Sequence, residues 1–173
     1  MEYQTIEYEL EDGIATVTLN RPDTHNSVNS IMSRELPAVW REFEADDDAV
    51  VAILSGAGER TFCAGADLTD LPETDGGGRE GSLEGFCWTS LQNQVWKPVI
   101  CAVNGMCCGG AFYLLAECDI IIAADHATFF DPHVTYGMAA VCEPMKMAQR
   151  MPLGEILRLT LLGSHERRSA ETA

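Results

Sequence analysis

Two glycine-containing segments have the residue types needed to bind an oxygen that becomes negatively charged. Gly109 and Gly110 follow the apolar run Val99–Val103 and open a predicted helix. The second segment, residues 56–68, follows the apolar run 50–54. The first amides of a helix lack internal partners, and glycine lets a ligand lie directly against the peptide. Two such turns at the ends of parallel strands could supply converging N–H donors, as an oxyanion hole requires. Alternatively, the glycines only let helix and strand pack closely.

Three segments, in this order, resemble the crotonase superfamily, the enoyl-CoA hydratase/isomerase group. They are LNRPDTHNSVNSIM at residues 19–32, SGAGERTFCAGADL at 55–68, and KPVICAVNGMCCGGAFYLLAECDIIIAAD at 97–125. Each motif alone is moderately specific, but the three together cover nearly the whole chain in the order of the family. The resemblance implies an α/β fold, a crotonase-like spiral of ββα units, and an acyl-CoA thioester as substrate.

The resemblance also assigns roles to individual residues. It implies that the amides of Ala64 and Gly110 hold the thioester oxygen as it becomes enolate-like. Five residues match the walls of the channel for the adenine and pantetheine parts of coenzyme A: Ser27, Val28, Ala66, Asp67 and Leu68. Coenzyme A is expected only as part of the substrate, with no permanently bound cofactor and no metal. Because coenzyme A is anionic, three basic residues are candidate phosphate contacts, unless they are simply solvated: Arg21, Arg60 and Lys97.

Two positions depart from the pattern of the family's hydratases, where a glutamate pair works as acid and base on water. The resemblance places Tyr113 and His133 at these positions. An imidazole has an unperturbed pKa of about 6.5 and suits general acid–base work. Asp131 could orient the His133 ring, and Glu143 is a further candidate carboxylate, whereas Tyr113 can donate a hydrogen bond but is a poor base. Alternatively, Tyr113 and His133 only line an apolar pocket.

These residues predict an acyl-CoA enzyme that stabilises a thioester enolate and does not perform standard glutamate-pair hydration. Isomerisation, hydration by an altered pair, and hydrolysis of a C–C or thioester bond all remain open. A non-catalytic acyl-CoA-binding subunit is the alternative, favoured by the missing glutamates and opposed by the retained glycine turns. The acyl group cannot be deduced, although four aromatic residues indicate a bulky or aromatic-lined pocket: Phe86, Trp88, Phe130 and Tyr136.

Composition narrows the class of protein. The 173 residues suffice for one crotonase-like core domain, residues 1–173. A net charge of −16 argues against a nucleic-acid partner, because a phosphate-binding surface needs clustered Lys and Arg. No apolar run has the length of a membrane span, and the start MEYQTIEYEL is polar, so a cytoplasmic protein is predicted. The seven cysteines include no C-x-x-C and are predicted to be reduced thiols.

Hydrophobic patterning predicts the elements that position these residues. Strands are expected at 3–10 and 14–19 around a hairpin turn at Glu11-Asp12-Gly13, and a buried strand at 120–124. A helix should begin at Asn29 or Ser30 and bury one apolar stripe: Met32, Leu36, Val39, Trp40 and Phe43. Further helices are expected at 82–96, 145–151 and 153–162, and a loop at 71–83 that serves as a lid or is disordered.

The last residues predict a missing C-terminal region. Gly163 stops a helix, and Ser169 could cap another, yet the chain finishes at Ala173 within its first turn. In the family this position is followed by a helical region that helps to assemble trimers. We therefore expect a chain without its C-terminal helical region, and by resemblance a homotrimer or hexamer.

Overall fold

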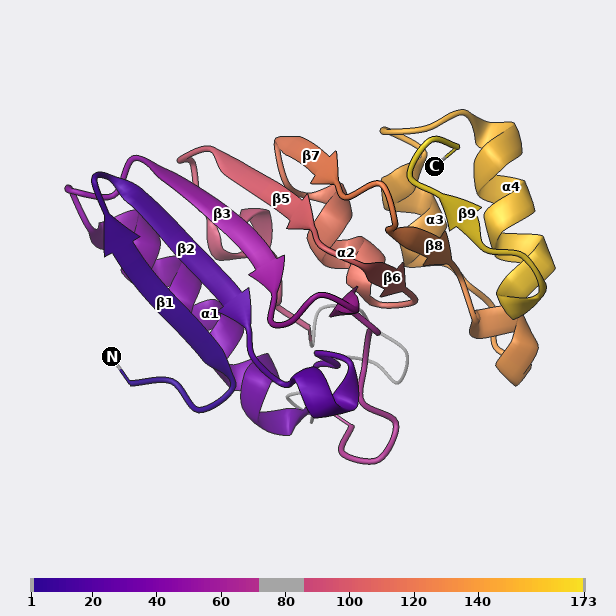
Figure 1. The fold of residues 1–173 in the computed structure, drawn as a ribbon, viewed down its shortest axis with the longest axis horizontal. Coiled ribbons are helices and arrows are strands. Elements are labelled where there is room, and N and C mark those ends of the chain that lie inside the picture. The colour runs from indigo at the N-terminus through magenta and orange to yellow at the C-terminus, as the bar shows by residue number, and fades with distance from the viewer. Residues whose placement is uncertain (1, 72–85, 173) are drawn as a thin grey trace.

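The computed structural model describes residues 2–71 and 86–172, which form two β-sheets with helices packed against them (Figure 1). The larger sheet has the strand order β1-β2-β3-β5-β7. Its strands are β1 (Ile6–Glu11), β2 (Ile14–Leu19), β3 (Val51–Gly56), β5 (Val99–Val103) and β7 (Ile120–Ala123). β1 and β2 are an antiparallel hairpin, and the following pairs, β2/β3, β3/β5 and β5/β7, are parallel. Asp12 and Gly13 both have positive φ, which confirms the predicted hairpin turn.

The smaller sheet has the order β4-β6-β8-β9. Its strands are β4 (Thr61–Cys63), β6 (Met106–Cys108), β8 (Thr128–Phe130) and β9 (Arg168–Ser169). β4, β6 and β8 run parallel, and β9 pairs antiparallel with β8. The chain therefore passes from the larger sheet into the smaller one three times, from β3 to β4, β5 to β6 and β7 to β8. This repetition confirms the predicted spiral of ββα units.

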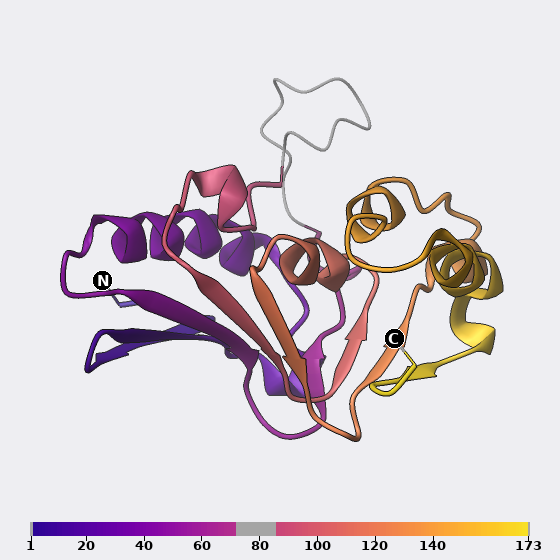
Figure 2. The same ribbon diagram turned by 90° about the horizontal axis from the view of Figure 1, so that it is seen from above.

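The helices are α1 (Ser30–Ala45), α2 (Ala111–Ala116), α3 (Cys142–Met147) and α4 (Leu153–Leu162), with short 3-10 turns η1 (Pro22–Thr24), η3 (Leu91–Asn93), η4 (His133–Tyr136) and η5 (Gly163–His165). The two sheets diverge, and α2 lies in the angle between them (Figure 2). The bounds of α4 confirm the prediction, whereas α3 begins three residues before the predicted 145–151 helix. None of the described helices has the length and apolar character needed to cross a membrane.

Helix α1 forms as predicted, because local capping and the apolar stripe agree. The Asn29 side chain accepts a hydrogen bond from the Met32 amide at 3.0 Å and caps the first turn. The five predicted stripe residues are all buried in the core. At the other end, the Lys97 ammonium donates to the carbonyls of Phe43 and Asp46. The Trp40 indole donates to the Trp88 carbonyl at 2.7 Å, which fixes the segment that enters β5.

Two element predictions were wrong. Residues 82–85 of the predicted helix 82–96 lie outside the described residues. In the described remainder, 86–96, only the turn η3 is helical. The Asn93 side chain donates to the carbonyls of Cys87 and Thr89, so side-chain bonds replace helical ones there. The strand predicted at 120–124 forms as β7, but it is not buried as expected: it is an edge strand of the larger sheet, and its Ile120 and Ile122 are 54% and 59% exposed.

Other differences follow from very short strands. Periodicity did not reveal β4, β6 or β8, each of three residues, so Gly109-Gly110 follows β6 rather than β5 directly. Ser169 belongs to β9 and does not cap a helix. The predicted loop 71–83 lies outside the described residues apart from residue 71.

Candidate active site

The turn after β4 and the turn after β6 abut at two glycines. Gly65 has φ +83°, in the left-handed region that side chains rarely adopt. A Cβ at Gly65 would lie 2.6 Å from the nitrogen of Gly110, closer than such atoms approach in proteins. A Cβ at Gly110 would in turn lie 3.4 Å from the nitrogen of Ala66. Glycine at both positions therefore brings two main-chain nitrogens from separate turns into one small region.

The amides of Ala66 and Gly110 are both available as donors. Val28 donates to the carbonyl of Gly65 at 2.8 Å, and Asp67 donates to the carbonyl of Val28 at 2.9 Å. In such a parallel bridge the residue between the bonded groups directs its own N–H to the other side. The Ala66 N–H therefore faces away from Val28, toward the turn of Gly110. Neither amide donates to an acceptor among the described residues.

Ala64 was the wrong choice for the first donor. Its amide donates to the carbonyl of His25 at 3.1 Å and is not free to bind a ligand. Ala66, two residues further on, has the amide that donates no hydrogen bond among the described residues. The composition of the segment Ala64-Gly65-Ala66 could not distinguish the two, because only the pairing with Val28 determines which N–H turns inward.

His133 lies between two buried carboxylates. Its Nδ1 contacts the Asp131 carboxylate, whose Oδ1 also accepts from the His133 amide at 3.1 Å. Its Nε2 lies 3.5 Å from Oε1 of Glu143. Asp131 and Glu143 are only 1% and 6% exposed. The hydrogen bond to Asp131 raises the pKa of His133, burial opposes this, and the charges of Asp131 and Glu143 add to the increase.

Tyr113 is in the first turn of α2 and neighbours the same carboxylate. Burial raises the pKa of the Tyr113 phenol strongly, and the nearby Glu143 carboxylate raises it further. Tyr113 therefore stays a neutral hydrogen-bond donor. The structure thus brings together Tyr113 and His133, which are 20 positions apart in the sequence, and adds Glu143 between them.

An aromatic wall lies beside the two amides. A Cβ at Gly110 would be 3.3 Å from a ring carbon of Trp88. The Trp88 ring meets Tyr113 edge-on with centroids 6.4 Å apart, and its indole N–H donates to the Ser33 hydroxyl at 2.7 Å. Phe86 stacks on Trp88 with centroids 4.9 Å apart. Of the four aromatic residues noted in the sequence, Tyr136 is 65% exposed, so it does not form part of a closed wall in this chain.

The residues expected along the coenzyme A channel differ in accessibility. Val28 is fully buried, so it contributes its backbone pairing rather than a contact surface. Leu68 is 63% exposed and Ser27 only 7%. Asp67 binds Arg21 at 2.9 Å, and Thr69 donates to the same carboxylate, which lowers the pKa of Asp67 to about 2. Thr69 is the larger cause of this shift.

Two of the three candidate phosphate contacts already have partners. The Arg21 guanidinium donates to the Ser27 carbonyl at 2.6 Å as well as to Asp67. Lys97 binds the carboxyl end of α1 and lies over the Phe43 ring. Both side chains therefore have structural roles. Arg60 is exposed, and its role in phosphate binding remains a prediction.

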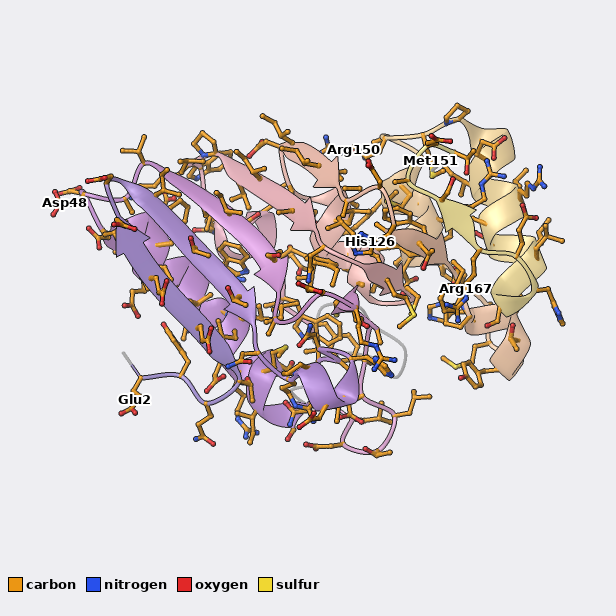
Figure 3. All side chains as sticks on the ribbon, in the orientation of Figure 1. Glu2, Asp48, His126, Arg150, Met151 and Arg167 are labelled. Carbon is orange, nitrogen blue, oxygen red and sulfur yellow. The ribbon has the colours of Figure 1, made fainter. Side chains whose placement is uncertain are left out.

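A cavity of about 410 Å³ lies on another side of α2. Phe112 and Leu115 of α2 line it, with Met147 of α3 and the following Arg150 and Met151. Figure 3 labels Arg150 and Met151 on the segment between α3 and α4. None of Ala66, Gly110, His133 and Glu143 is among its lining residues. This cavity is therefore separate from the amide pair. Within the described ranges, no group of three or more His, Cys, Asp or Glu side chains could hold a metal ion.

Comparisons with known proteins show the family of the chain. Residues 9–171 match the family described as enoyl-CoA hydratase/isomerase. The chain is 40% identical over 129 residues to a mevalonyl-coenzyme A hydratase of Aspergillus fumigatus, covering 74% of this chain and 47% of that protein. It is 38% identical over 145 residues to a short-chain-enoyl-CoA hydratase of Clostridium acetobutylicum, covering 80% and 53%.

A solved structure is equally similar. An enoyl-CoA hydratase/isomerase from Mycobacterium paratuberculosis superposes with a TM-score of 0.86 at 39% identity, covering 98% of this chain and 65% of that one. The chain spans about half the length of the curated relatives it matches. By its sequence and its fold, it belongs to the enoyl-CoA hydratase/isomerase family of the crotonase superfamily.

Proposed function

We propose that this protein binds an acyl-CoA thioester and stabilises its enolate between the amides of Ala66 and Gly110. The observation that carries the proposal is the pair of unoccupied N–H groups on two turns that meet at Gly65 and Gly110. Preorganised donors stabilise developing negative charge more effectively than water does, because they need no reorganisation. The relatives support the substrate class, since their names describe hydratases of coenzyme A esters.

The reaction itself requires a proton to move on the carbon next to the thioester. Among the described residues, Tyr113, His133 and Glu143 carry groups that can do this, and they form one connected cluster around Glu143. The phenol and imidazole differ from the glutamate pair expected of a hydratase, so we propose proton transfer within an altered set. Assembly into a homotrimer or hexamer is a further proposal, based on the family alone and testable by light scattering.

Ligand binding tests the amide pair directly. Calorimetry would compare butyryl-CoA with S-butyl-CoA, a thioether that lacks only the carbonyl oxygen. We expect the thioester to bind about 30-fold more tightly, since each of the two hydrogen bonds contributes about 1 kcal/mol. Equal affinities, or no binding of either compound, would reject the proposal. Hydrogen–deuterium exchange at the carbon next to the carbonyl, followed in D₂O by mass spectrometry, then separates an enzyme from a non-catalytic binding subunit.

A further inference from the structure

The cluster around His133 contains several groups that could accept a proton, and their surroundings differ. Asp131 is the most buried residue of the cluster, 1% exposed, and its Oδ1 forms hydrogen bonds with the amide and the ring of His133. It is therefore shielded from any ligand by the imidazole. Glu143 belongs to the first turn of α3, and its carboxylate approaches the other nitrogen of the same ring, Nε2.

His133 is not suited to accept the proton. Both of its ring nitrogens face carboxylate oxygens, and both contacts are attractive only when both nitrogens carry a proton. The pKa of His133 is accordingly raised by its two acidic neighbours. An imidazolium held in this way can orient a carboxylate or donate a proton, but it has no free lone pair.

Tyr113 is excluded for a different reason. Its phenol is half-buried, and the neighbouring Glu143 carboxylate disfavours a second negative charge, so the pKa of Tyr113 rises. The neutral phenol donates a hydrogen bond and cannot take a proton at neutral pH. Lys146 approaches the Tyr113 ring face at 5.6 Å from its centroid and forms an ion pair with Glu117, so its ammonium is occupied.

We infer that Glu143 is the general base, a carboxylate from α3 that works between Tyr113 and His133. This inference rests on the proposed function, because the proton comes from the acyl-CoA substrate. α3 packs against α2 (Figures 1 and 2), and the Glu143 carboxylate neighbours Tyr113, which lies three residues after Gly110 in the first turn of α2. His133 and Asp131 act as positioning residues that hold the Glu143 carboxylate.

The step balances without an additional reagent. A Glu143 oxygen takes the proton from the carbon next to the thioester carbonyl and becomes a carboxylic acid. The electron pair of the broken C–H bond forms the C=C bond of the enolate, and the carbonyl π pair moves to oxygen. The N–H groups of Ala66 and Gly110 hold that oxygen. Return of a proton from Glu143 regenerates the carboxylate, and in D₂O deuterium is introduced when the carboxylic acid exchanges its proton with solvent before this return.

The exchange of butyryl-CoA and phenylpropionyl-CoA in D₂O tests the assignment without knowledge of the natural acyl group. Glu143→Gln preserves shape and removes the base, so we expect exchange at least about 100-fold slower with acyl-CoA affinity retained. Glu166→Gln is the matched control, because Glu166 pairs with Arg158 on a different surface and its loss should leave exchange unchanged. Survival of exchange in Glu143→Gln, with its loss in His133→Gln, would overturn the inference.

Two further measurements guard against a folding defect. Glu143→Asp keeps a carboxylate, and we expect it to exchange faster than Glu143→Gln; equal rates in a folded protein would count against the base. Added formate should restore exchange in Glu143→Ala, which a purely structural role would not produce. Failure of the wild type to bind either thioester would reject the proposed function itself, and binding without exchange would reject any catalytic base. Exchange that survives in a folded Glu143→Gln protein would overturn only the role of Glu143.

Discussion

The two halves of the candidate site are built in different ways. The Ala66–Gly110 half is made of main-chain amides, and its geometry depends on two glycines and a bridge to Val28. The half around His133 is made of side chains from the turn after β8 and from α3. Main-chain donors persist through most substitutions, whereas a side-chain cluster changes its chemistry with a single residue. The amide half therefore defines what the protein can bind, and the side-chain half defines which reaction follows.

The largest expected effect comes from closing the amide half. Gly65→Ala would place a methyl group 2.6 Å from the Gly110 nitrogen at a residue with φ +83°. The turns must separate, so we expect exchange of butyryl-CoA to fall by about 10²–10³-fold, as for loss of an oxyanion donor. Gly154→Ala is the matched control, because nothing lies within 4 Å of the added methyl. Its helical position predicts unchanged exchange and a slightly higher Tm.

The side-chain half should respond to Asp131→Asn with a smaller change. An amide in place of the carboxylate weakens the hold on His133, so the pKa of His133 should fall, and exchange should slow by about tenfold. NMR titration of the imidazole measures the first effect. Because the folded pKa is raised, the stability that His133 contributes in the wild type is complete below about pH 6.5 and is lost as pH rises through that raised pKa. Urea denaturation at pH 6 and pH 9 checks this sign, and an unshifted titration would contradict it.

The contrast between the halves also explains what the sequence could predict. Residue type and order were enough for α1 and for the glycine turns, because turns and apolar stripes are local signals. The spiral was predicted from the resemblance to the crotonase superfamily and not from periodicity. Which amide is free was not predictable, since Ala64 and Ala66 differ only in the pairing with His25 and Val28. Glu143 stood out only as a candidate, because its contact with His133 crosses from the turn after β8 to α3.

Asp67→Asn tests whether the hydrogen bonds of Asp67, the residue after Ala66, contribute to the stability of the fold. The Asp67 carboxylate binds Arg21 and accepts from Thr69, so we expect the free energy of unfolding at pH 7 to fall by about 1–3 kcal/mol. The folded pKa is depressed to about 2, so this contribution is present above the unfolded value of about 4 and is lost as pH falls toward 2. Urea denaturation at pH 7 and pH 3 should therefore show a smaller difference between the two proteins at the lower pH. A constant difference would contradict the linkage.

The smallest effect is expected at Lys97, which separates structural cations from ligand contacts. Lys97→Met keeps the apolar stem and removes the ammonium that binds the carbonyls at the end of α1. Unfolding should become easier by about 0.3–1 kcal/mol, with little change in acyl-CoA affinity. Arg60→Met is the comparison, because Arg60 is exposed and remains a candidate phosphate contact. If Lys97→Met weakened binding more than Arg60→Met did, the Lys97 ammonium would have to leave α1 to contact coenzyme A. Lys97 would then be a ligand contact as well as a structural residue, which would contradict the purely structural role assigned to it.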